Sequence, residues 1–73
     1  MTGNSGIDLR QIAQDCGIFD KKDASVIVEN LEGLKNTYSS KELVSIYNYL
    51  LANSSEPEVI MYLIRCVDVY RDK

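Results

Sequence analysis

Apolar residues recur every three or four positions along most of this chain, in four separate stretches. This spacing places them on one face of an α-helix. No stretch shows the strict alternation of a half-buried strand, and no turn dipeptide such as Asn-Gly separates two such runs. We therefore predict an all-α fold, a small bundle of three to four short helices. The predicted helices cover about residues 6–16, 21–36, 40–52 and 56–71.

Each predicted helix begins after a residue that can cap its N-terminal N–H groups. The predicted caps are Ser5, Asp20, Ser39 and Ser55. Ser39 and Glu42 have the spacing of a reciprocal capping box, and so have Ser5 and Asp8. Gly17 stands where a left-handed C-terminal cap belongs, so we expect the first helix to end at Cys16.

The spacing of apolar residues in the first three helices also predicts the core. The expected core positions are Leu9, Ile12, Ala13 and Cys16, then Ala24, Ile27, Val28, Leu31 and Leu34, then Leu43, Val44, Ile46, Tyr47, Leu50 and Leu51. Cys16 and Cys66 both lie on apolar faces, so we expect them to be core residues. A redox role would require an activated thiolate, and the sequence leaves that question open.

The fourth predicted helix is more apolar than the others. At 100° per residue its apolar side chains spread over roughly 220°, whereas a surface helix usually carries an apolar arc of about 100° or somewhat more. One interpretation is a central helix wrapped by its three neighbours. The other is a helix with one side in the core and the other against a second copy, paired about a two-fold axis. For that homodimer, the predicted contacts are Ile60, Leu63, Ile64, Val67 and Tyr70.

The chain has 73 residues, which corresponds to one domain. Residues 1–6 are rich in Gly, Asn, Ser and Thr, and we expect a mobile segment there, ahead of a single helical domain at 7–73. A domain of this size buries only about 60% of its unfolded surface. It usually needs further stabilisation from disulfides, a metal or oligomerisation. Two cysteines without histidine predict neither a disulfide framework nor a metal site. Self-association or binding to a larger partner remains as the expected source of additional stability.

The net charge and the absence of histidine argue against several classes of function. The chain has eight Lys and Arg against eleven Asp and Glu, a net charge of −3 that opposes nucleic-acid binding. Without histidine it lacks the commonest general acid or base, so we expect no enzyme, no cofactor and no metal. The sequence has neither a signal-peptide pattern nor an apolar run long enough to span a membrane. We therefore expect a cytoplasmic protein.

Four residues off the apolar stripes are candidates for contact with a partner protein. Tyr49 falls on the polar side of the third helix, and Val26 falls outside the stripe of the second. Surface aromatic residues are favoured anchors at interfaces, although single exposed apolar residues are also normal. Glu29 and Glu32 add acidic charge to the second helix. Tyr49 and Val26 are also compatible with an ordinary solvated surface.

The order of short motifs resembles the YmgB/AriR family of small two-component-system connector proteins. The resemblance rests on Cys16-Gly17-Ile18-Phe19, the Ala24-Ser25-Val26-Ile27 helix, the segment from Ser39 to Val44, and Val59-Ile60 followed by Arg65. It implies a cytoplasmic, all-helical homodimer without enzymatic activity. It also implies a role in biofilm, capsule and acid-stress responses through a phosphorelay or a neighbouring regulator. The family has been linked to DNA binding, which the net charge of this chain opposes.

Three functional hypotheses follow. The first is a regulatory adaptor that dimerises through its last helix and binds a signalling or transcriptional protein. The second is an immunity protein, antitoxin or phage-type inhibitor whose acidic residues match a basic target. Those acidic residues would be Asp15, Asp20, Asp23, Glu29 and Glu32. The third is a DNA-binding, nucleoid-associated regulator, which would need clustered cations that no predicted helix face provides.

Overall fold

The computed structural model describes residues 7–20 and 22–71, and its regular structure is helical. The helices are α1 (Leu9–Cys16), α2 (Ala24–Gly33), the short 3₁₀ helix η1 (Leu34–Asn36), α3 (Ser40–Asn53) and α4 (Pro57–Arg71). No strand occurs within these described ranges, so the predicted all-α fold is confirmed. The mobile segment expected at 1–6 and the cap expected at Ser5 lie outside the described residues.

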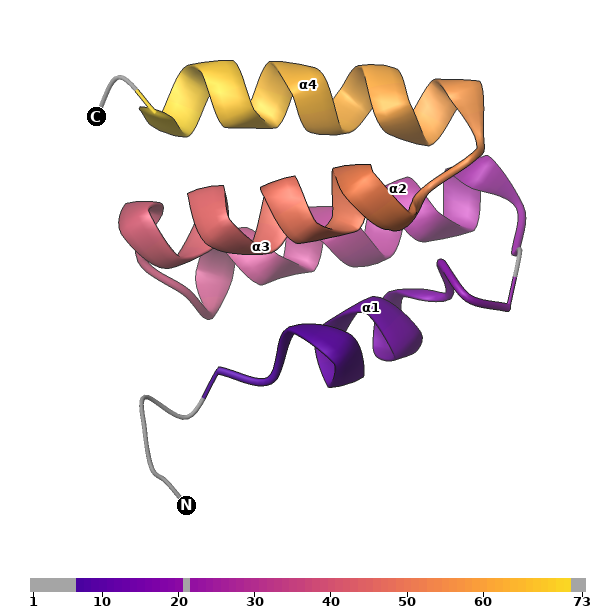
Figure 1. Ribbon diagram of the computed structural model, residues 1–73, viewed down its shortest axis with the longest axis horizontal. Helices are drawn as coiled ribbons and strands as arrows, with labels where there is room; N and C mark the ends of the chain where they lie inside the picture. The colour runs from indigo at the N-terminus through magenta and orange to yellow at the C-terminus, as the bar shows by residue number, and fades with distance from the viewer. Residues whose placement is uncertain (1–6, 21, 72–73) are drawn as a thin grey trace.

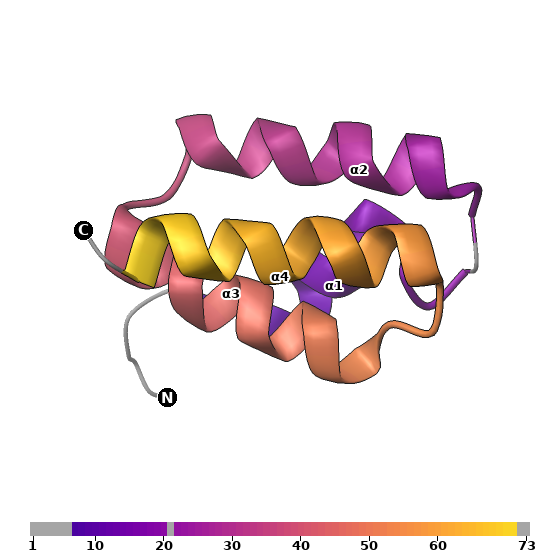
Figure 2. The same cartoon turned by 90° about the horizontal axis from the view of Figure 1, so that it is seen from above.

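The helices stack in three levels (Figure 1), with α4 at the top, α2 and α3 below it, and α1 at the bottom. Seen from above (Figure 2), α2 and α3 flank α4 on opposite sides while α1 passes beneath. α4 packs most extensively against α3 and also contacts α2. Its upper side is left uncovered by the described part of the chain. α4 is therefore not wrapped on all sides: one side lies in the core and the other faces solvent.

The helix N-termini differ from the sequence prediction at three caps. α1 begins after Asp8, whose carboxylate accepts a hydrogen bond from the Gln11 N–H at 3.1 Å. Asp23 rather than Asp20 precedes α2, because residues 17–20 form a turn. α4 begins at Pro57 and the Ile60 N–H donates to the Glu56 carbonyl, so Ser55 lies one residue too early to cap it. Acidic and hydroxyl side chains crowd these helix starts, and the sequence alone does not choose between them.

The capping box predicted at the start of α3 is confirmed, because both of its hydrogen bonds are present. The Ser39 hydroxyl accepts from the Glu42 N–H at 3.4 Å, and the Glu42 carboxylate accepts from the Ser39 N–H at 2.9 Å. The second predicted helix is shorter than expected, because α2 ends at Gly33 and continues only as η1. A glycine has low helix propensity, and a tightened 3₁₀ turn is a common helix ending.

Gly17 ends α1 in the left-handed conformation, with φ of 94°, as the sequence predicted. Its N–H donates to the Gln14 carbonyl and the next N–H, of Ile18, donates to the Ala13 carbonyl. These bonds satisfy carbonyls that the end of a helix leaves free. The Asn30 side-chain amide donates to the Cys16 carbonyl at 3.1 Å and so fastens the end of α1 to α2.

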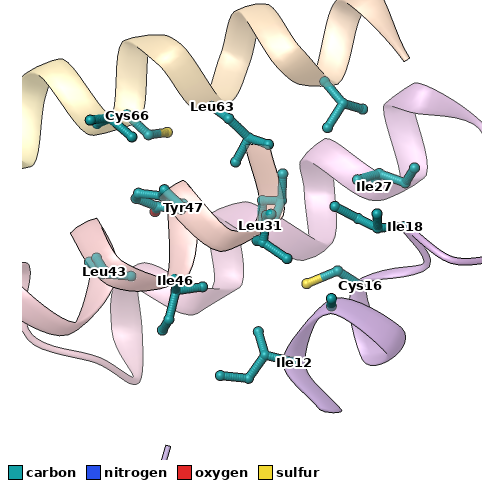
Figure 3. Close-up of a cluster of buried hydrophobic side chains, with 14 residues drawn as sticks. Ile12, Cys16, Ile18, Ile27, Leu31, Leu43, Ile46, Tyr47, Leu63 and Cys66 are labelled. Carbon is teal, nitrogen blue, oxygen red and sulfur yellow. The ribbon is translucent and has the colours of Figure 1, made fainter. Parts of the chain in front are cut away.

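A single hydrophobic core joins all four α-helices (Figure 3). Every residue predicted for the core of the first three helices is buried or half-buried. The fully enclosed large side chains come from the three upper helices, and they are Leu31, Leu43, Ile46, Tyr47, Leu50, Val59 and Leu63. Cys16 and Cys66 are both buried and unpaired, which confirms that they belong to the core.

Candidate protein-binding surfaces

The solvent-facing side of α4 carries large apolar side chains. Met61 is 59% exposed and Ile64 is 45% exposed. The half-buried Ile60 lies one helical turn before Ile64. We call Ile60, Met61 and Ile64 the outer patch. Neighbouring exposed apolar side chains mark interaction sites more often than scattered ones do, so this patch is the first candidate binding surface.

The five residues predicted to contact a second copy do not share one surface. Leu63 is fully buried and Val67 is 9% exposed. Figure 3 shows Leu63 directed from α4 into the core. Leu63 has no exposed surface and Val67 has very little, so these two residues are corrected to core positions. Ile60 and Ile64 remain on the outer patch, and the half-buried Tyr70 packs partly against the core.

Sequence reasoning missed three exposed apolar residues. Met61 is 59% exposed on the side of α4 opposite the core and is absent from the predicted contacts. Val69 is 55% exposed and is also absent from them. Phe19 is 43% exposed in the turn after α1, where no helical periodicity could have placed it.

The four residues predicted to contact a partner lie on two separate helices. On α2, Val26 is 40% exposed, and Glu29 and Glu32 are also exposed. Glu32 accepts a hydrogen bond from the Tyr62 hydroxyl at 3.4 Å and therefore faces α4. Tyr49 on α3 is half-buried against the core. Because α2 and α3 lie on opposite sides of α4 (Figure 2), the structure does not bring Val26 and Tyr49 together on one surface.

The interface between α3 and α4 contains a small polar cluster of Tyr47, Cys66 and Tyr62. Burial, followed by the neighbouring Cys66 thiol, raises the pKa of Tyr47 above its usual value. Burial and the same thiol also raise the pKa of Tyr62. Tyr47 and Cys66 lie close together (Figure 3), but they do not meet hydrogen-bond geometry. The Tyr47 hydroxyl is therefore buried without a hydrogen-bond partner among the described residues.

Cys16 has the chemistry of a packed thiol. Burial, with a smaller effect of the adjacent Asp15, raises the pKa of Cys16 from 9.0 to about 11. A thiol with a raised pKa is a poor nucleophile near neutral pH, since the thiolate is the reactive form. Within residues 7–20 and 22–71, no group of three His, Cys, Asp or Glu is arranged to hold a metal ion. No helix in the same ranges has the length and apolar character needed to cross a membrane.

Comparisons with protein-family models, with curated proteins and with solved structures give no match to this chain.

Proposed function

We propose that this protein is a small, non-enzymatic regulatory adaptor that binds other proteins and forms a homodimer through the outer patch. The observation that supports the proposal is the exposure of Met61 and Ile64 on the uncovered side of α4. The resemblance to YmgB/AriR proteins supports a cytoplasmic role that connects to a phosphorelay or a transcriptional regulator.

The exposed area sets the strength of the proposed dimer. Complete burial of an isoleucine or methionine side chain contributes roughly 2 kcal/mol. Met61 and Ile64 are each about half exposed, so a two-fold interface that covers them gains about 4 kcal/mol over both copies. A micromolar Kd requires about 8 kcal/mol. The proposed dimer therefore assembles at concentrations well above micromolar.

A dilution series of amide NMR spectra tests the proposed interface residue by residue. Chemical shifts of Ile60, Met61 and Ile64 should change with concentration, because dimer formation changes their surroundings. Shifts of α1, which lies on the opposite side of the molecule (Figure 1), should stay constant. Spectra without any concentration dependence up to millimolar protein would argue against the dimer.

A second candidate function is an inhibitor of a basic target protein. The N-terminal ends of α2 and α4 bring Asp23, Glu56 and Glu58 around one open pocket, with Lys22 as its cation. Three carboxylates in one place favour a basic partner and increase its association rate at low salt. An association rate with a basic nuclease that falls steeply with salt would support this function, and salt-independent association would remove it.

A further inference from the structure

A second surface on α4 has a different chemistry from the outer patch. A cleft of about 240 Å³ lies between η1 and residues 62–70 of α4. Lys35 contributes one wall from η1, and the residues of α4 that line the cleft are Tyr62, Arg65, Cys66, Val69 and Tyr70. We call this site the Lys35–Arg65 cleft. Its two sides are brought together by the packing of α2 on α4.

The floor and one side of the cleft are apolar or aromatic. Val69 is 55% exposed, Tyr62 and Tyr70 are half-buried, and Cys66 is buried beneath them. Sites for drug-sized molecules usually measure about 300–1,000 Å³. The cleft is smaller and open, so its size favours an anchoring side chain of a larger partner over a free small molecule.

The rim of the cleft is basic in a protein that is acidic as a whole. The Lys35 ammonium lies 5.9 Å from the centre of the Tyr62 ring, a distance compatible with a cation–π contact. Among the described residues, the observed salt bridge joins Arg71 to Asp68. Neither Lys35 nor Arg65 forms one within these ranges. Glu32 is the nearby acid, and it accepts a hydrogen bond from Tyr62. Two cations thus stand beside an apolar surface without a carboxylate of their own.

We propose that the Lys35–Arg65 cleft binds an acidic segment of a partner protein. An aliphatic or aromatic side chain of that segment packs on Val69 between Tyr62 and Tyr70. Carboxylates on either side of this anchor face Lys35 and Arg65, and this charge complementarity selects the partner. A nucleic acid is a poorer fit, because phosphate binding requires more than two cations. Two carboxylates, of Glu32 on α2 and Asp68 on α4, also lie within one helical turn along the chain from Lys35 and Arg65.

This inference rests on the proposed function of a protein-binding adaptor, but it uses residues outside the outer patch. A phage-displayed library of random linear peptides, selected on the immobilised full chain, is the direct probe. We expect enriched peptides in which Asp or Glu flanks a single large apolar residue. Fluorescein-labelled synthetic copies of the enriched peptides then give Kd values by anisotropy.

Charge reversal with Lys35→Glu and Arg65→Glu together should weaken binding of these peptides by about tenfold or more. The matched control is Arg10→Glu with Ser45→Glu and Asn48→Glu, which changes the net charge equally at exposed positions that do not line the cleft. It should retain the wild-type Kd. Circular dichroism checks that both variants fold, and Lys35→Met provides a milder variant if the charge reversal unfolds the chain.

Each result decides the proposal. A selection without enriched peptides, or one that enriches basic or uncharged peptides, overturns it. Peptides that bind the Lys35→Glu/Arg65→Glu variant as tightly as wild type also overturn it. The outer patch is unchanged in these variants. A variant that no longer binds the peptides but self-associates as wild type does would therefore separate this site from the proposed dimer.

Discussion

The ring of Tyr47 on α3 packs against the ring of Tyr70 on α4, with centroids 5.9 Å apart and planes tilted by 44°. Tilted aromatic pairs at this separation contribute about 0.5–1.5 kcal/mol beyond the area that they bury. The pair joins the middle of α3 to the last turn of α4. It holds in place the end of α4 that carries the Lys35–Arg65 cleft.

Replacing Tyr47 with phenylalanine should not destabilise the protein. The phenyl ring of the variant would keep the packing, while a buried hydroxyl that has no hydrogen-bond partner among the described residues would be removed. Such a hydroxyl costs about 1 kcal/mol or more to bury, so Tyr47→Phe should leave the free energy of unfolding unchanged or raise it by about 1 kcal/mol. Urea denaturation measures the difference. A loss of stability would show that the hydroxyl makes a bond in solution.

Two glycine-to-alanine substitutions should have opposite effects. Gly17 has a positive φ of 94°, and an added Cβ would lie 2.5 Å from Cδ of Lys22. Gly17→Ala should therefore destabilise the protein by about 1–2 kcal/mol. Gly33 has helical geometry and open space at the Cβ position. Gly33→Ala should stabilise it by about 0.5–1 kcal/mol.

Thermal unfolding followed by circular dichroism compares the two glycine variants with wild type in one experiment. Equal effects of both substitutions would contradict the different roles assigned to Gly17 and Gly33.

Alkaline pH should weaken the fold through Cys16. Its pKa is raised from 9.0 to about 11 by burial, so the folded state keeps a proton that the unfolded state releases. Stability is thus fully present below about pH 9 and is lost as the pH rises toward about 11. Urea midpoints across this range, compared between wild type and Cys16→Ala, isolate the contribution of this thiol. An identical pH dependence in both proteins would contradict it.

The sequence predicts most of this fold because its signals are local. Ser39 and Glu42 are three residues apart and form the predicted capping box, and Gly17 adopts the left-handed conformation that its position favours. The predicted starts of α1 and α2 were wrong because several possible capping residues lie close together in the sequence. Several acidic or hydroxyl residues adjoin each start, and the sequence alone does not choose between them. The Asp8 carboxylate caps α1, whereas Asp23 precedes α2 without a side-chain cap hydrogen bond.

The binding surfaces could be predicted only in part, because they depend on how the helices pack. The sequence shows that the apolar residues of α4 extend over more than one face of the helix. It does not show which of these faces α2 and α3 cover. Leu63 was therefore assigned to an interface although it is fully buried, and Met61 was missed although it is 59% exposed. Lys35 and Arg65 meet at one cleft only through the contact of α2 with α4, and helical periodicity carries no information about that contact.

Sedimentation equilibrium of the full chain tests the central claim, that the outer patch of α4 is a self-association surface. From about 10 μM to about 1 mM, wild type should rise from the monomer mass toward the dimer mass. Ile64→Asp should remain monomeric while keeping its helical circular dichroism. Val26→Asp, which replaces a valine of similar exposure on α2, should behave as wild type. A wild-type chain that is monomeric throughout, or an Ile64→Asp variant that associates as wild type does, would contradict the claim.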